Sequence, residues 1–485
     1  MQKIILAGIC FFIALSSFIV RSIDPTCVEL PASLFNYSNI PLPVDILNNI
    51  NEMDNMPSSN PTTDAGATLG RVLFYDPDLS KNHKISCSSC HIQQFSFTDT
   101  ARFSVGFDGQ LTARNSMGLV HARFQKDSAF FWDNRAATLE IQVLEPIKSS
   151  VEMGLSLDTL ISRVSAKPFY PPLFQAAFGS RIVTTDRISK ALSQFVRSIN
   201  TFGSKFRQGV NSSNGPPEST PFANFTPQEN LGKNLFMDIR RGNCQACHTR
   251  NIMVPQGSKN IGLDIVYADN GVGQATGNVS KNGQFSVPSL INVELTAPYM
   301  HDGRYKTLEQ VINFYSDSIK PHPQLDGFLR EIIPGNPIPN NNPCNTCPPR
   351  RIQYTEEEKA ALLAFLKTLT DTSLIKDPRW SSPFCEKDNN NVINPLLSFK
   401  TFPNPIKSGA IIQVKIIAGQ SFNGTIRLLS SSGQLLLIKS CTVSVGDNAI
   451  SLGSNQLASG LYVIQLLDAR GGSLGSIKLV VSNSS

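Results

Sequence analysis

Two stretches of the sequence carry the same spacing of thiol and imidazole side chains. They are Cys87-Ser88-Ser89-Cys90-His91 and Cys244-Gln245-Ala246-Cys247-His248. Two thiols at this spacing can add to the two vinyl groups of a haem, and the adjacent histidine can then bind the iron as its proximal ligand. A single copy of the pattern also fits a disulfide, or half of a zinc site, beside a chance histidine.

The residues that precede the two sites are repeated as well. Residues 69–76 and 231–238 both read Leu-Gly-basic-x-Leu-Phe-x-Asp. Self-similarity of this kind indicates a duplicated structural unit. Because the upstream text and the Cys-x-x-Cys-His pattern recur together, the sequence predicts two covalently bound haem c groups.

Composition sets the broad class of the protein. The chain has 485 residues, which is too long for one compact core, so several domains are expected. Apolar residues make up 41% and charged residues 16%, as in globular proteins. The net charge of +6 is small for this length and no basic run occurs, so no nucleic-acid partner is predicted.

The first 22 residues read as a signal peptide, because Lys3 is followed by an apolar run that reaches Val20. An uncleaved anchor is the alternative, although the run is short for a membrane span. Cys10 lies inside the apolar run, which argues against a lipoprotein. Export agrees with covalent haem attachment.

The chain has ten cysteines. Four belong to the haem sites, Cys10 lies in the signal peptide, and an odd number remains: Cys27, Cys344, Cys347, Cys385 and Cys441. Cys344 and Cys347 are followed by Pro348 instead of histidine, which favours a local disulfide over a third haem site or a zinc site. The other pairings stay open.

The predicted fold is mainly α, with two cytochrome c-like haem lobes from an internal duplication and a small C-terminal all-β sandwich. Helices are expected over 157–164, 185–200, 307–315 and 355–369, the last opened by a capping box of Thr355 and Glu358. Strand-like runs occupy 411–417, 424–429, 434–438, 460–466 and 477–481. The expected order is an extended lead-in (23–67), the first lobe (68–208), a linker (209–225), the second lobe (226–385), a linker (386–400) and the sandwich (401–485).

Further motifs resemble the bacterial dihaem cytochrome c peroxidase family, including its MauG branch. The resemblance covers about residues 68–370. Besides the two haem sites, it rests on Phe131-Trp132-Asp133-x-Arg135, on Pro146 with Val151-Glu152-Met153-Gly154, and on the segment Ala297–Gly303.

The tail resembles a type IX secretion system sorting domain. The segments that carry this likeness are Phe402–Pro405, Ser432–Gln434, Leu457–Tyr462 and Lys478–Val481. The resemblance implies secretion machinery as a partner. It also implies passage through the periplasm to the cell surface or the medium.

For the first haem, the resemblance implies a catalytic site on the distal face. Glu152, twenty residues after Trp132, would be the general acid-base, Gln142 would orient peroxide, and Pro146 would shape the pocket. A surface carboxylate is the alternative for Glu152. The loop 102–111 lacks the removable distal histidine of many relatives and has Phe107 instead, so a five-coordinate first haem is expected in the resting ferric state.

For the second haem, the resemblance implies an axial ligand fourteen residues after His301. That position is Tyr315, as in MauG, where classical members have methionine. A phenolate would stabilise ferric iron and lower the potential. Met300 is a rival ligand and a buried core tyrosine is the other alternative. His301 is expected to support a haem edge or propionate.

Between the haems, Trp132 would relay electrons, with core packing as its alternative role. Asn115 and the backbone carbonyls of Thr296 and Pro298 would form an inter-haem Ca²⁺ site. The implied reaction reduces hydrogen peroxide to water with electrons from a small donor, a cytochrome c or a cupredoxin, which enter at the second haem. MauG-like oxidation of a protein substrate and a non-catalytic electron-transfer cytochrome are the alternatives. Family members often form dimers.

Overall fold

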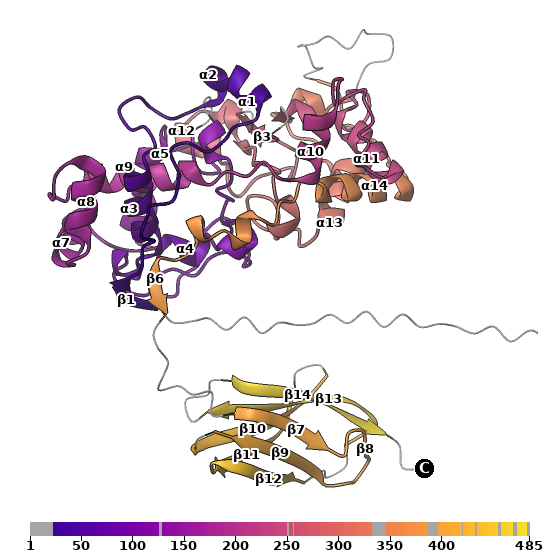
Figure 1. Cartoon of the computed structure of the whole chain (residues 1–485). Coiled ribbons are helices and arrows are strands. Elements are labelled where there is room, and N and C mark those ends of the chain that lie inside the picture. The colour runs from indigo at the N-terminus through magenta and orange to yellow at the C-terminus, as the bar shows by residue number, and fades with distance from the viewer. Residues whose placement is uncertain are drawn as a thin grey trace, which may run out of the picture. The chain divides into compact units, whose positions relative to one another are not determined.

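The computed structural model describes residues 23–485 apart from 126–128, 250–251, 256, 332–345, 387–395, 420, 432–433, 454–456, 469–472 and 483–485. The predicted signal peptide, 1–22, lies outside the described residues. The chain forms two compact units, one spanning Asp24–Cys385 and the other containing Glu386–Ser485 (Figure 1). In the described part of the chain, no helix combines the length and apolarity needed to cross a membrane.

The first unit is mainly helical. Its helices are α1 (Val44–Asn48), α2 (Ile50–Met53), α3 (Asp64–Tyr75), α4 (Cys87–Cys90), α5 (Leu139–Gln142), α6 (Glu145–Lys148), α7 (Leu157–Ala166), α8 (Tyr170–Phe178), α9 (Thr185–Ser198), α10 (Lys205–Ser212), α11 (Pro227–Met237), α12 (Val272–Thr276), α13 (Leu308–Asn313) and α14 (Glu356–Lys367). Three short strand pairs accompany them: β1 (Ile23–Val28) with β6 (Phe384–Glu386), β2 (His248–Thr249) with β3 (Val254–Pro255), and β4 (Ser258–Lys259) with β5 (Phe285–Ser286).

Side-chain caps start the helices where the sequence predicts them. The capping box of Thr355 and Glu358 opens α14, which satisfies backbone amides that the first turn leaves free. Thr307 caps α13 in the same way. The α-helical part ends at Asn313, and a π-helical turn, Phe314–Ser318, follows directly. The side chain of Tyr315 is therefore carried by that turn.

Two helix pairs cross in the same manner. In the first, α3 packs against α9, where a side chain at Gly70 would collide with the backbone oxygen of Ala191. In the second, α11 packs against α14, where a side chain at Gly232 would collide with the backbone oxygen of Ala361. The glycine of the repeated Leu-Gly-basic text is thus needed for close helix contact in both places.

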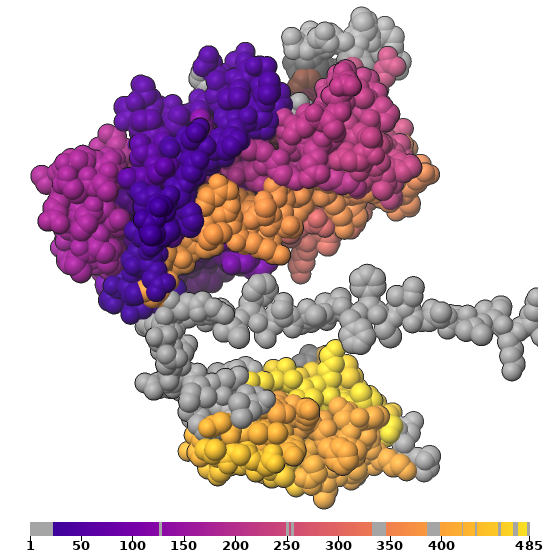
Figure 2. Space-filling model, in the orientation of Figure 1, coloured from indigo at the N-terminus to yellow at the C-terminus, as the bar shows by residue number. Residues whose placement is uncertain are grey.

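The lead-in is not uniformly extended, which corrects the sequence prediction. It contains β1, α1 and α2, and α3 already begins at Asp64 because Thr63 caps it. The disulfide Cys27–Cys385 joins β1 to β6 at the end of the unit. Figure 2 shows the orange residues near this end packed directly against the indigo N-terminal residues.

The remaining cysteines are partly accounted for. Cys347 is disulfide-bonded, whereas Cys344, its predicted partner, lies outside the described residues. Cys441 is a free thiol, in agreement with the odd number of cysteines left after haem attachment.

The second unit consists of two β-sheets. One has the strand order β11-β10-β13-β14-β8 and the other β12-β9-β7. Alternate side chains of β9 are buried, as expected for a sheet with one face in the core. The strands are β7 (Leu396–Phe402), β8 (Ile406–Lys407), β9 (Ile412–Ala418), β10 (Phe422–Ser430), β11 (Leu435–Val443), β12 (Gly446–Leu452), β13 (Gly460–Asp468) and β14 (Ser473–Ser482).

These sheets agree with the predicted C-terminal β region, but three strands were missed. β7 begins inside the stretch predicted as a linker, 386–400. β8 has only two residues, and β12 reads Gly-Asp-Asn-Ala-Ile-Ser-Leu, which is too polar to stand out in sequence.

Candidate active site

The first Cys-x-x-Cys-His site lies on the short helix α4 and the residue after it. Ser86 and Ser89 form a capping box at the start of this helix. Cys87 and Cys90 are both free thiols. The Nδ1 atom of His91 lies 3.0 Å from the carbonyl oxygen of Phe97, so a proton on Nδ1 leaves Nε2 free as a metal ligand.

Burial sets the protonation of these groups. It raises the pKa of Cys87 to about 12 and that of Cys90 to about 11. It lowers the pKa of His91 below its usual value. The imidazole is therefore neutral, which is the form that binds a metal.

The charge of Glu152 acts on both of these cysteines. After burial and other contributions, its negative charge further raises the pKa of both Cys87 and Cys90. Burial also raises the pKa of Glu152, although a hydrogen bond with Ser149 and the charge of Arg135 oppose the shift. A carboxyl group with a raised pKa is suited to exchange protons with a substrate.

A tight turn joins Glu152 to Pro146. The amide of Glu152 donates to Ser149 Oγ at 3.2 Å, and the amide of Met153 donates to the carbonyl of Pro146 at 3.2 Å. The structure thus brings Glu152 and Pro146 together. Gln142 is half-buried at the end of α5, just before α6.

Phe107 bonds the loop 102–111 to this turn. Its amide donates to the carbonyl of Glu152 at 2.9 Å, and its ring occupies the space where Gly154 lacks a side chain. The loop 102–111, which lacks histidine, is therefore docked beside Glu152.

The second Cys-x-x-Cys-His site borders a large, mainly apolar cavity. Cys244, Cys247 and His248 line it from one part of the chain and Tyr315 lines it from another. Both cysteines are free. The Nδ1 atom of His248 lies 3.1 Å from the carbonyl oxygen of Pro288, and burial lowers the pKa of His248 to about 4.

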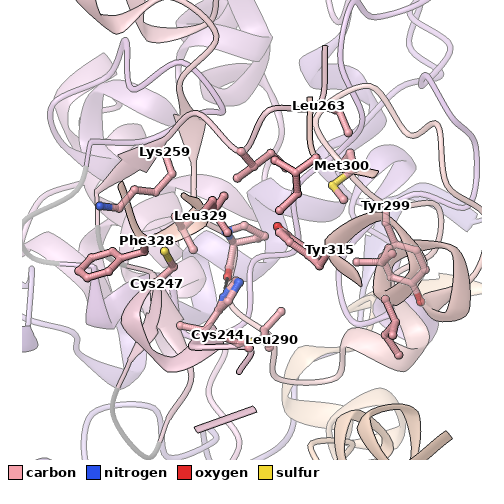
Figure 3. Close-up of a pocket in the computed structure, with 18 of the residues that line it drawn as sticks. Cys244, Cys247, Lys259, Leu263, Leu290, Tyr299, Met300, Tyr315, Phe328 and Leu329 are labelled. Atoms are coloured by element: carbon pink, nitrogen blue, oxygen red, sulfur yellow. Dashed lines mark hydrogen bonds between the residues drawn. The ribbon is translucent and has the colours of Figure 1, made fainter. Parts of the chain in front are cut away.

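Tyr315 and Met300 both line this cavity. Figure 3 shows the hydroxyl oxygen of Tyr315 pointing into the cavity, toward the side that carries the cysteines. Burial raises the pKa of Tyr315, and the nearby Cys247 and Cys244 raise it further. Loss of its proton at neutral pH would therefore need a strongly bound cation beside the oxygen.

Trp132 borders the second site and is hydrogen-bonded to the segment that contacts the first. It lines the large cavity and also a smaller one that contains Asn115, Thr296 and Pro298. Its indole N–H donates to the carbonyl of Asn115 at 2.8 Å, and its ring meets that of His301 edge-on at 6.5 Å.

His301 lines the large cavity as well and stacks on Phe285, with ring centroids 3.6 Å apart. Of the other histidines, His83 is exposed and pairs with Asp78. His121 is buried and its Nε2 lies 2.8 Å from the carbonyl of Thr201. His83 is therefore a surface residue and His121 a structural one.

Several contacts at the site were missed by sequence reasoning. Phe97 and Pro288 act through backbone carbonyls, which any residue type could supply, so no sequence signal marks them. Ser116 Oγ lies 3.3 Å from His91 Nδ1, and a lone serine gives no signal either. Arg114 joins Asp133 to Asp269 by ion pairs.

The residues present fit covalent haem at both sites. Each offers two free thiols and a neutral histidine with one nitrogen engaged by a carbonyl. A zinc site fits less well. Within the described ranges, the only cluster of three potential metal ligands is Cys27, Glu29 and Cys385, two of which form the disulfide.

Comparison with known proteins places these observations in a family. Residues 64–214 match the family described as di-haem cytochrome c peroxidase, and residues 400–482 match the secretion system C-terminal sorting domain. The methylamine utilization protein MauG of Methylorubrum extorquens is 30% identical over 321 residues, covering 64% of this chain and 80% of that protein. The cytochrome c551 peroxidase of Nitrosomonas europaea is 32% identical over 306 residues, covering 59% and 86%.

Solved structures agree with this assignment. A crystal structure of a MauG-like protein associated with microbial copper homeostasis is 33% identical, with a TM-score of 0.59, and covers 71% of this chain and 99% of that chain. The diheme peroxidase BthA from Burkholderia thailandensis shares the fold, with a TM-score of 0.51 at 21% identity over 76% of this chain and 96% of that one. The chain therefore belongs to the di-haem cytochrome c peroxidase and MauG family, and it carries a type IX secretion sorting domain, which indicates export.

Proposed function

We propose that the protein is a dihaem c-type peroxidase that reduces hydrogen peroxide to water with electrons from a small external redox protein. The observation that supports this most is the difference between the two Cys-x-x-Cys-His sites. A carboxyl group of raised pKa, Glu152, acts through its charge on the thiols of the first site, whereas a tyrosine hydroxyl, Tyr315, points into the cavity of the second. One site thus has a proton-transfer group and the other has a candidate axial ligand.

At the first site, Cys87, Cys90 and His91 would hold the haem, whose iron would supply the binding of peroxide. Glu152 would accept a proton from one peroxide oxygen and return it to the other, which leaves as water. Two electrons and two further protons complete the balance to two water molecules. Gln142 and Pro146 would position the substrate.

At the second site, Cys244, Cys247 and His248 would hold the haem, Tyr315 would be a further ligand of its iron, and His301 would support the group.

Trp132 would relay electrons to the first site, since it borders the second cavity and bonds the Asn115 segment next to the first. Trp132→Phe should slow electron arrival at the first haem. Trp380→Phe is the control, because Trp380 is the other tryptophan of the chain and its indole N–H donates to Ser198 in α9 instead of to the Asn115 segment.

Two finer features are part of the proposal. Asn115, with the carbonyls of Thr296 and Pro298, would bind Ca²⁺, and the smaller cavity that gathers these three residues supports this. The two haem lobes would derive from a duplication, for which the repeated sequence text and the matching glycine crossings of α3 with α9 and α11 with α14 are the support.

MauG-like oxidation of a protein substrate is the second candidate function. Tyr315 favours it, because the methionine of classical peroxidases is replaced at this position. A phenolate ligand lowers the potential of its haem, which would make reduction by a small donor less favourable.

The test is a peroxide titration of the resting ferric protein, with EPR and optical spectra. We expect one high-spin and one low-spin haem in equal amounts, and repeated peroxide turnover when reduced cytochrome c is added. A long-lived oxidised state that ignores small donors would favour the MauG-like function. Two low-spin haems that do not respond to peroxide would leave an electron carrier.

The route to the cell surface is tested separately. A variant truncated after Lys400 lacks the matched sorting segment, 400–482, almost completely. We expect this variant to accumulate in the periplasm with both haems attached. Normal surface delivery of the truncated protein would contradict the proposed route.

A further inference from the structure

Two adjacent residues, Asn115 and Ser116, touch both haem-binding regions. The carbonyl of Asn115 accepts the indole N–H of Trp132 at 2.8 Å, and its amide donates to the carbonyl of His301 at 2.8 Å. The hydroxyl of Ser116 donates to the carbonyl of Cys90 at 2.7 Å. One short segment therefore bonds Trp132, the second site's motif and the first site's attachment helix.

The same hydroxyl also reaches the proximal histidine. Ser116 Oγ lies 3.3 Å from His91 Nδ1. Because its own proton is directed to the carbonyl of Cys90, an oxygen lone pair is available to the histidine N–H. His91 Nδ1–H is then shared between two acceptors, Ser116 Oγ and the carbonyl of Phe97.

Acceptors at this nitrogen have known consequences for a metal-bound histidine. They fix the tautomer and the orientation of the ring, and they raise the basicity of the ligating nitrogen. A more basic ligand stabilises ferric over ferrous iron and so lowers the reduction potential. A second acceptor should therefore lower the potential of the first haem further.

Within the described residues, the second site lacks this arrangement. Among the contacts of the described residues, His248 Nδ1 has the carbonyl of Pro288 at 3.1 Å and no side-chain hydroxyl. The difference separates the two proximal histidines, although their sequence motifs are the same.

We propose that Ser116 is a positioning residue for the first haem site, which fixes His91 and connects it to the segment that bonds Trp132. The path runs from the Trp132 indole through the Asn115 carbonyl and the backbone to the Ser116 hydroxyl, and from there to His91. It is continuous in covalent and hydrogen bonds. This inference rests on the proposed two-haem arrangement and adds to it a residue that tunes only one of the haems.

The test uses Ser116→Ala and Ser116→Thr in the full-length holoprotein. Ser193→Ala is the matched control, because Ser193 is a buried serine in α9 whose hydroxyl also donates to a backbone carbonyl, that of Ser189. The potentials of the two haems are measured by spectroelectrochemistry, and the rate of electron arrival at the first haem is measured after rapid reduction of the second.

For Ser116→Ala, we expect a raised potential of the first haem and an unchanged potential of the second. The raised potential favours electron arrival, but loss of the bonded path through the Ser116 hydroxyl should outweigh it and slow arrival about 10-fold, the lower end of the activity losses that follow removal of such a partner. Ser116→Thr keeps a hydroxyl and should restore both values, and Ser193→Ala should change neither. Unchanged potentials and rate in Ser116→Ala would overturn the inference. A wild-type protein that lacks haem on Cys87 and Cys90 would instead overturn the proposed function, and haem content by mass distinguishes the two failures.

Discussion

The N-terminal half of the first unit carries the Cys87–His91 site and its C-terminal half carries the Cys244–His248 site. The two halves share their attachment chemistry and differ in the side chains that lie near it. Both place two free thiols and a neutral histidine after a helix that crosses a partner at a glycine. Glu152, held by a docked turn, lies near the thiols of the first half. Tyr315, carried by a π-helical turn, faces the second. Because iron chemistry depends on the ligand and the polarity opposite the histidine, this difference can divide the roles of two otherwise similar sites.

The halves also differ in the charged residue near the end of α9 in the first half and of α14 in the second. Arg197 lies six residues after the crossing residue Ala191, and its side chain is 1% exposed and paired with Glu140. Lys367 lies six residues after Ala361, and its side chain is 51% exposed and loosely paired with Glu294. The first pair ties α9 to α5, the helix that carries Gln142, whereas the second lies at the surface.

The largest effect is expected from Glu152→Gln. Loss of the proton-transfer group should lower kcat/KM for peroxide about 10²- to 10⁴-fold, with both haems retained. Glu145→Gln is the matched control, since Glu145 lies in the preceding helix and forms a partly exposed pair with Lys148. Peroxidase activity close to wild type in Glu152→Gln would remove the functional contrast between the halves.

The two ion pairs should differ in stability when their carboxylates are neutralised. Glu140→Gln leaves the buried Arg197 charge without its partner and should cost about 3–5 kcal/mol of unfolding free energy. Glu294→Gln should cost about 0–1 kcal/mol, because that pair is exposed. Urea unfolding of the holoprotein measures both values. Equal losses of unfolding free energy in the two variants would show that the difference in burial does not affect the strength of the ion pairs.

Tyr315→Phe should abolish the low-spin EPR signal of the second haem and leave the first unchanged. The reason is that phenylalanine offers no oxygen to the iron, while the cavity keeps its shape. Met300→Leu, at the rival residue of the same cavity, should preserve the signal. If instead Met300→Leu removes the signal and Tyr315→Phe does not, methionine is the ligand.

The smallest effect is a shift in pH dependence. Burial raises the pKa of Glu152 above the ordinary value of 4.5, and only the ionised carboxylate can accept a proton from peroxide. Activity should therefore fall on acidification, with its midpoint above pH 4.5, and this acid limb should disappear in Glu152→Gln. A midpoint below 4.5 in the wild type would contradict the raised pKa.

Sequence reasoning worked best where a signal is local. The capping box of Thr355 and Glu358 lies within one helical turn, and α14 starts there as predicted. The alternation in β9 likewise marks a strand with one buried face. It worked less well for the lead-in, because α1 and α2 are too short to show a helical period. It also missed β12, a polar segment that is a strand because it pairs with β9.

The sequence by itself determined the covalent chemistry of this protein. Thiol spacing, the adjacent histidines and the repeated Leu-Gly-basic text are properties of neighbouring residues, and they specify two haem sites before any folding is considered.

Only the tertiary structure decided what surrounds those sites. The Cys27–Cys385 disulfide joins residues 358 positions apart. Trp132 bonds Asn115, and Arg197 pairs with Glu140, through contacts that a linear pattern does not record. The physical reason is that burial and hydrogen bonding depend on which distant segments pack together. The same Cys-x-x-Cys-His pattern at His91 and His248 therefore acquires different partners.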